Sequence, residues 1–212
     1  MSGYKVPMIG MAYYTDTQVP AVRKALFGIK ALYGSQIAEA SRLTGVAEEL
    51  IASVVFIESS GKTDAVSSAG ALGLMQLKPE TAEDAVWLAA RKDLLTDELK
   101  AALNRVLRGR LTALLKRANL SVLPALRIPR ALLLRPDVSI LLGSLLLLLL
   151  LKESAEKDEE ARLDKVIARY NQGYFYRPKG SVKQVVATAP KEAAGYILKL
   201  VGINSTLDLL TA

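Results

Sequence analysis

Residues 56–82 read FIESSGKTDAVSSAGALGLMQLKPETA, with one acid between an apolar run and a glycine-rich segment. Glu58 ends the run AEELIASVVFIE, residues 47–58, whose apolar content and spacing predict a helix. A carboxyl at the end of such a run loses part of its hydration, so its pKa is expected to rise. Taken alone, Glu58 reads better as a solvated helix terminus. Gly73 to Gln76 follow in a loop, and Pro79 suits the first turn of the next helix.

The composition limits the chemistry that the chain can perform. Its 212 residues contain no cysteine and no histidine. Disulfides, thiolate or histidine metal sites and Ser-His-Asp catalysis are therefore excluded. No metal or cofactor is expected, and acid–base chemistry has to come from Asp, Glu, Lys or Tyr. The length fits one domain, or one domain with an arm.

Helical periodicity runs through most of the chain, and no period-two alternation persists that would indicate a strand. After an irregular arm over residues 1–17, we expect helices over residues 19–33, 36–44, 47–58, 79–92, 96–115, 138–151, 153–172 and 190–200. The apolar run Val138–Leu151 has 14 residues. Because about 18 are needed to cross a bilayer, it is expected to be a buried helix. The sequence therefore predicts an all-α protein.

Four groups of residues together carry a family resemblance. In chain order they are Glu58-Ser59 with Gly73-Leu74-Met75-Gln76, Asp137-Val138-Ser139-Ile140 with Gly143, Tyr170-Asn171-Gln172-Gly173, and the helix from Glu192 to Leu200 around Tyr196. This order resembles the motifs of soluble-type lytic transglycosylases, which cleave the glycan strands of peptidoglycan. The resemblance runs from about residue 33 to about residue 202. It implies a lysozyme-like fold, shared with goose-type lysozymes.

The resemblance also implies a division of the chain. Residues 1–32 would be an N-terminal arm and helix. Residues 33–212 would be the lysozyme-like domain. Residues from about 84 to about 135 exceed the family's usual spacer, so they would be a basic helical insertion.

The resemblance implies a role for each matching residue. Glu58 would be the only catalytic acid and then the base, with Ser59 orienting it by a hydrogen bond. Gln76 and the backbone at Met75 would line the sugar-binding groove. Tyr170 would place its hydroxyl near Glu58, and Asn171 would contact the substrate. From the residues alone, Tyr170 reads better as a core aromatic, and Asn171-Gln172-Gly173 reads better as the end of a helix.

The implied reaction is the non-hydrolytic cleavage of the bond between N-acetylmuramic acid and N-acetylglucosamine, giving 1,6-anhydro ends. The muramic C6 hydroxyl is the nucleophile, so no second carboxylate is needed to activate a water. Asp64 is the nearest candidate for such a carboxylate, but it reads better as a loop residue. A goose-type lysozyme that hydrolyses the bond and a non-catalytic wall-binding or structural module are the alternatives.

The net charge of +7 comes from one window of nine basic residues without an acid: Lys100, Arg105, Arg108, Arg110, Lys116, Arg117, Arg127, Arg130 and Arg135. Such a window favours a polyanionic partner. The basic helix expected at 99–118 is therefore a solvated face, a clamp on anionic wall polymer, or a surface that engages a membrane. Nucleic acid is not expected, because the window from 100 to 136 has no aromatic residue to stack on bases.

The N-terminal residues MSGYKVPMIGMAYYTDTQVP lack the charged start and long apolar run of a signal peptide. We therefore expect synthesis in the cytoplasm and action on the bacterial cell wall by another route. A phage lysin or a virion-borne wall-degrading enzyme fits this expectation.

Overall fold

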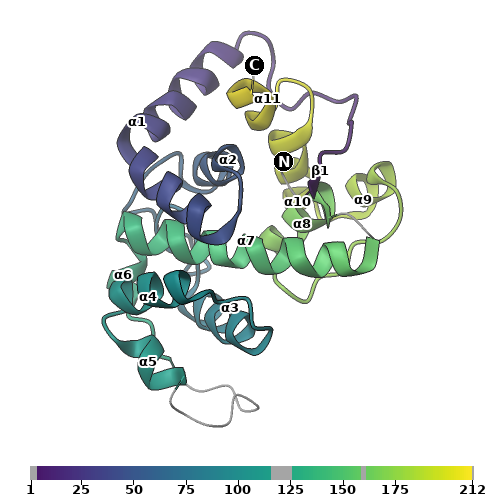
Figure 1. Ribbon diagram of the computed structural model, residues 1–212. Coiled ribbons are helices and arrows are strands. Elements are labelled where there is room, and N and C mark those ends of the chain that lie inside the picture. The colour runs from purple at the N-terminus through teal and green to yellow at the C-terminus, as the bar shows by residue number, and fades with distance from the viewer. Residues whose placement is uncertain (1–3, 116–125, 159–160, 212) are drawn as a thin grey trace. The chain divides into compact units, whose positions relative to one another are not determined.

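The structure, a computed structural model, describes residues 4–115, 126–158 and 161–211 (Figure 1). The chain divides into two compact units. The terminal unit comprises Met1–Leu32, Ala47–Ile57 and Leu150–Ala212, and the central unit comprises Tyr33–Val46 and Glu58–Leu149. The described residues are mostly helical, so the all-α class is confirmed. The division expected from the resemblance, at residue 32 and around an insertion, stays a prediction.

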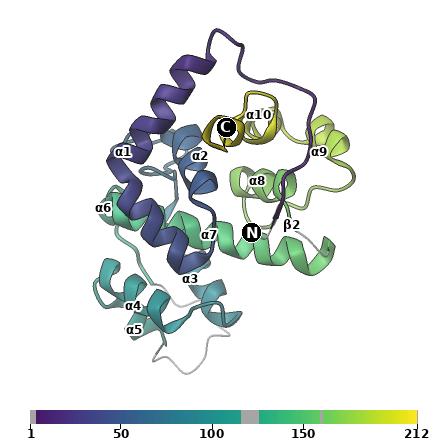
Figure 2. The same ribbon diagram turned by 45° about the horizontal axis from the view of Figure 1, so that its top comes forward.

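In the terminal unit, the N-terminal arm is not irregular throughout. Strand β1 (Tyr4–Lys5) pairs in parallel with β2 (Ala161–Arg162) (Figure 2). Ala12 also forms a single bridge with Ile203. The expectation of an irregular arm without any strand was therefore wrong in part. The reason is physical: a two-residue strand shows no alternation, and its partner lies far away in the sequence.

Four helices of the terminal unit follow β2. They are α8 (Leu163–Gln172), α9 (Val182–Thr188), α10 (Lys191–Val201) and α11 (Thr206–Thr211). Helix α10 packs against the other three. A separate apolar cluster of the same unit is formed by Tyr14, Val22, Leu26 and Leu209 with Val19, Phe56 and Leu210. The helix expected over 190–200 is confirmed as α10.

Helix α1 runs without a break over Val19–Thr44. We expected two helices with a stop at Gly34-Ser35, and this was wrong. A Cβ added at Gly34 would meet nothing within 4 Å. A glycine inside a helix costs about 1 kcal/mol relative to alanine. Burial of Leu26, Ile29 and Ile37 on either side of Gly34 offsets that cost.

In the central unit, the stretch at residues 96–115, where one helix was expected, forms the two helices α4 (Asp97–Val106) and α5 (Arg110–Leu115). Helix α3 (Pro79–Arg91) precedes them, and α6 (Arg130–Leu133) follows (Figure 1). The single helix expected over 96–115 was wrong, because Arg108 and Gly109 adopt left-handed φ angles of 53° and 82°. Lys116 and Arg117 lie outside the described residues.

Helix α7 spans Pro136–Asp158 and joins the leucine run to the acidic segment after it. The separate helix expected over 153–172 was therefore wrong in its start, since α8 begins only at Leu163. Residues Pro136–Ala155 are long and apolar enough to cross a membrane by length and composition, so the length argument against a span was wrong as well. Of the apolar window, 78% is buried in the protein, as in a core helix.

Candidate active site

Glu58 lies one residue before the end of helix α2 (Glu48–Ser59). The helix expected over 47–58 is confirmed, and its residues Leu50 to Val55 are fully buried. Glu58 itself is half-buried, as are Phe56 and Ile57 before it. The carboxyl thus leaves the apolar run at the point where the helix meets the surface. Its expected pKa rise stays a prediction.

Ser59 connects the end of α2 to the turn at residues 73–76, which we call the GLMQ turn. Its hydroxyl donates to the carbonyl of Leu74 at 2.9 Å and accepts from the amide of Gly61 at 3.2 Å. The Tyr33 hydroxyl donates to the carbonyl of Gly61 at 3.0 Å. Hydrogen bonds of Gly61 with Ser59 and Tyr33 therefore fix the backbone from Ser59 to Gly61, directly after Glu58. The orienting bond from Ser59 to Glu58 stays a prediction.

Gln76 closes the loop that contains the GLMQ turn. Its side-chain amide nitrogen donates to the carbonyls of Ala65 and Gly73, at 3.1 and 3.0 Å. Its φ angle of 45° lies in the left-handed region, where an L-residue is strained. Bridges between Val66 and Leu72 and between Leu72 and Leu77 complete the loop. The Gln76 side chain thus fixes the loop that contains the GLMQ turn, and its contact with a sugar stays a prediction.

Met75 is fully buried, and its surroundings explain two of the motif residues. Its amide donates to the Ser139 hydroxyl at 3.1 Å, across 64 residues of sequence. A Cβ added at Gly143 would come within 2.3 Å of the Met75 sulfur. Ser139 of α7 therefore holds the Met75 backbone, and Gly143 of α7 leaves room for the Met75 side chain. The sequence analysis gave Ser139 only as part of a motif, and its bond to Met75 was missed.

Gly73 is the residue of this turn that no other amino acid can replace without strain. Its φ angle is 72°, and an added Cβ would lie 2.1 Å from the carbonyl oxygen of Leu133. Backbone of α6 thus occupies the space of a side chain. Glycine permits both the left-handed conformation and the close approach.

Tyr170 and Asn171 lie near the end of α8, in the terminal unit. Tyr170 is buried, with 8% of its surface exposed. The Asn171 amide donates to the Glu192 carboxylate at 3.4 Å and accepts from the Gln172 amide at 2.6 Å. The structure therefore gathers Glu58, Ser59, Met75 and Gln76 in the central unit. The approach of the Tyr170 hydroxyl to Glu58 stays a prediction.

The basic window is partly neutralised within the central unit. Arg105 pairs with Glu39 at 2.7 Å, and Arg135 pairs with Asp137 at 2.7 Å. Lys100 pairs with Asp97 at 3.2 Å. A cavity of about 140 Å³ is lined by both members of the Arg105–Glu39 pair and by Gln36, Ala40, Val106, Asp137 and Leu141. It contains none of the predicted site residues.

Comparisons with known proteins found two similarities to this chain. Residues 35–102 match the model of the transglycosylase SLT domain family. A search of curated proteins finds no match. Among solved structures, the chain is similar to an inactive mutant of the lytic transglycosylase Slt from Pseudomonas aeruginosa, with a TM-score of 0.51 and 19% sequence identity. The similarity covers 78% of this chain and 22% of that one.

These findings confirm the expected resemblance and the lysozyme-like all-α fold. The matched family segment contains Glu58, Ser59, Met75 and Gln76, and it ends before Tyr170 and Asn171.

Proposed function

We propose that the chain, whose residues 35–102 carry a transglycosylase SLT domain, is a peptidoglycan lytic transglycosylase that cleaves the MurNAc-β-1,4-GlcNAc bond. One observation supports this proposal above the others. Ser59, directly after Glu58, is hydrogen-bonded to Leu74 inside the GLMQ turn, so the acid and the turn belong to one connected element. The family match covers that whole element.

Glu58 acts first as the general acid. Its carboxyl gives a proton to the oxygen between N-acetylmuramic acid and N-acetylglucosamine, and the C1–O bond breaks. The carboxylate then takes the proton of the muramic C6 hydroxyl, whose oxygen bonds to C1 and closes the 1,6-anhydro ring. No water is consumed. The attacking hydroxyl belongs to the same sugar, so its effective concentration is high without a second carboxylate to position it.

Asp64 is exposed in the loop between α2 and the GLMQ turn. This exposure agrees with the interpretation of Asp64 as a loop residue. The phage-lysin assignment stays a prediction of the sequence analysis, and so does the binding of anionic polymer or membrane by residues 99–118.

The test is digestion of purified sacculi by the wild type and by Glu58→Gln, with mass spectrometry of the soluble muropeptides. We expect anhydro products from the wild type and a rate about 10² to 10⁴ lower for the variant, the usual contribution of a general acid. The control is Glu48→Gln, which removes an acid at the other end of the same helix and should digest normally. Circular dichroism of each variant checks folding.

Each other result contradicts a defined part of the proposal. Reducing-end products would mean hydrolysis, as in a goose-type lysozyme. Digestion by folded Glu58→Gln at the wild-type rate would remove Glu58 from the mechanism. Binding to sacculi without release of any product would indicate a non-catalytic wall-binding module.

A further inference from the structure

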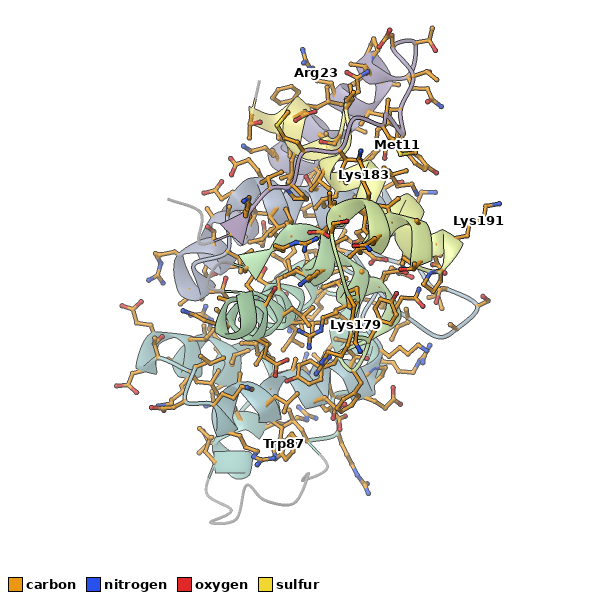
Figure 3. The ribbon with its side chains drawn as sticks, turned by 90° about the vertical axis from the view of Figure 1, so that its right-hand side faces the viewer. Met11, Arg23, Trp87, Lys179, Lys183 and Lys191 are labelled. Atoms are coloured by element: carbon orange, nitrogen blue, oxygen red, sulfur yellow. The ribbon has the colours of Figure 1, made fainter. Side chains whose placement is uncertain are left out.

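A second group of cations lies in the terminal unit, outside the basic window that the sequence analysis considered. Between residues 173 and 191 the chain carries four basic residues and no acid. These residues, which we call the basic edge, are Arg177, Lys179, Lys183 and Lys191. All four are exposed. Figure 3 shows the three lysines on the loop after α8, on α9 and at the start of α10.

The loop that carries Arg177 of the basic edge is held in place by a buried arginine. Arg169 is 5% exposed, and its guanidinium donates to the Tyr174 carbonyl at 2.8 Å and to Glu153 at 2.7 Å. Burial lowers the pKa of Arg169, and the hydrogen bond to Glu153 opposes that effect. Arg177 lies over the Tyr174 ring and donates to the Tyr174 carbonyl. The loop that leaves α8 therefore presents Arg177 in one position.

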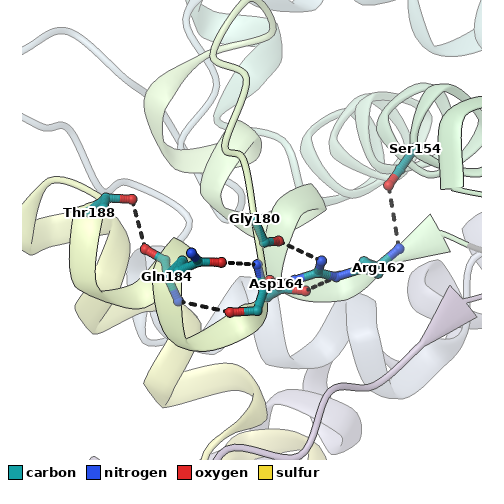
Figure 4. A network of polar contacts seen from close by, with 7 residues as sticks. Ser154, Arg162, Asp164, Gly180, Gln184 and Thr188 are labelled. Carbon is teal, nitrogen blue, oxygen red and sulfur yellow. Dashed lines mark hydrogen bonds and ion pairs between the residues drawn. The ribbon is translucent and has the colours of Figure 1, made fainter.

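The backbone around Lys179 and Lys183 is held in place by the network in Figure 4. Arg162 donates to the fully buried carboxylate of Asp164 at 2.7 Å and to the carbonyl of Gly180 at 2.7 Å. Ser181 and Gln184 form a capping box at the start of α9. Lys179 and Lys183 lie on either side of this cap. Their backbone is thus positioned by buried or paired groups, which lowers the ordering cost of binding a ligand.

The three lysines of the basic edge differ in their pairing from three of the basic residues in the window at residues 100–136. There, Lys100, Arg105 and Arg135 each have an acidic partner. Within the described part of the chain, Lys179, Lys183 and Lys191 form no salt bridge at 4.0 Å or less, and Arg177 approaches Glu153 only at 3.8 Å. These lysines therefore keep their charge available for an external anion.

The basic edge adjoins Asn171, for which the family resemblance predicts contact with the substrate. Lys191 is followed by Glu192, which accepts the hydrogen bond from Asn171. Helix α9 packs against α8 and α10, the helices that carry Asn171 and Lys191. Phe175, 82% exposed, lies in the same loop, with its ring edge-on to Tyr174 at 5.3 Å between centroids. The exposed lysines and the Phe175 ring thus lie on segments next to Asn171 in the same unit.

We infer that the basic edge binds the free carboxylates of the peptide stems on the glycan strand that Asn171 contacts. This inference rests on the proposed function, because it takes the substrate to be peptidoglycan. The glycan backbone offers Asn171 neutral hydroxyl and amide groups, whereas the stems carry the negative charges that several lysines complement. The side chains act in binding and specificity, and they take no part in the chemical step.

The test measures binding of Glu58→Gln protein to purified sacculi by co-sedimentation, so that the wall is not digested. The test variant adds Lys179→Gln, Lys183→Gln and Lys191→Gln. The control adds Lys5→Gln, Arg23→Gln and Lys24→Gln, which remove three exposed cations of the same unit and the same net charge. We expect the test variant to bind at least about fivefold more weakly than the control variant, with a gap that shrinks in high salt.

Two further samples of sacculi identify the anion. Capping the stem carboxylates as amides should remove the difference between the two variants, whereas acid removal of phosphate-containing wall polymers should leave it unchanged. Equal weakening by both variants would overturn the inference, because net charge alone would explain it. A gap that survives capping, or that vanishes with the phosphate polymers, would also overturn it.

The proposed function can fail separately. If the wild type releases no anhydro products while the variants still differ in carboxylate-dependent binding, the reaction is wrong and the surface stands. If anhydro products form and the variants bind alike, only the basic edge is wrong. Thermal unfolding of both triple variants within a few degrees of the parent shows that the comparison concerns folded protein.

Discussion

Replacement of Gly73 by alanine tests whether the GLMQ turn has the packing described above. Two costs are expected. A non-glycine residue at a φ of 72° costs about 1–2 kcal/mol. The added methyl would also lie 2.1 Å from the Leu133 carbonyl oxygen and 3.2 Å from the Ser139 hydroxyl. Such overpacking costs about 1–3 kcal/mol, because backbone of α6 has to move. The total loss is about 2–5 kcal/mol.

Gly45 is a matched control for this substitution. It has the same φ angle of 72° and lies in the same unit, but an added Cβ would meet nothing within 4 Å. Gly45→Ala should therefore lose only the conformational cost of about 1–2 kcal/mol. The gap between the two variants measures the contact with α6 alone.

Urea unfolding followed by fluorescence is the assay, since Trp87 is the only tryptophan and lies in α3 of the same unit. We expect the free energy of unfolding of Gly73→Ala to be about 1–3 kcal/mol below that of Gly45→Ala. Losses equal within about 0.5 kcal/mol would refute the reasoning, since that is the usual scatter between independent sites. The carbonyl of Leu133 would then not occupy the space beside Gly73.

Three further substitutions test other buried contacts. Ser139→Ala leaves the Met75 amide without the hydroxyl that it contacts, so the free energy of unfolding should fall by about 1–3 kcal/mol in urea titrations; no loss would mean that the bond contributes nothing. Asp164→Asn breaks the ion pair with Arg162 at a fully buried carboxylate and should lower stability by about 3–5 kcal/mol, whereas an unchanged melting temperature would contradict a stabilising role for the pair. Burial, and then two neighbouring glutamates, raise the pKa of Asp84. Its ionisation therefore destabilises the fold as pH rises through the unfolded-state pKa towards the folded one. Asp84→Asn should be more stable than the wild type at pH 7, and the gain should vanish at a pH below both values; a gain independent of pH would exclude this cause.

The helices that could be predicted are those whose signal is local. The run at residues 47–58 became α2 at Glu48–Ser59, and Pro79 begins α3 as its fixed φ favours. The segment at 190–200 became α10. In each case the apolar spacing and the first helical residues lie within the same short stretch. The motifs around Glu58 and the GLMQ turn were likewise visible, because they are contiguous residues.

The sequence misled where a local signal competed with packing. Gly34 predicted a stop inside α1, and the acidic residues after Leu151 predicted a new helix, yet both α1 and α7 continue. Burial of apolar residues over two or more turns outweighs the helix propensity of a single glycine or of an acidic stretch. In the opposite direction, Arg108 and Gly109 interrupt a stretch whose periodicity alone predicts one helix.

By itself, the sequence determined the helical class, the position of Glu58 at a helix end and the residue types around it. Only the tertiary structure decided what those residues contact. Ser139 binds the amide of Met75 across 64 residues, the Leu133 carbonyl fills the space beside Gly73, and Arg169 holds the loop that presents the basic edge. Periodicity and propensity act over a few residues, whereas these contacts join segments that become neighbours only when the chain has packed.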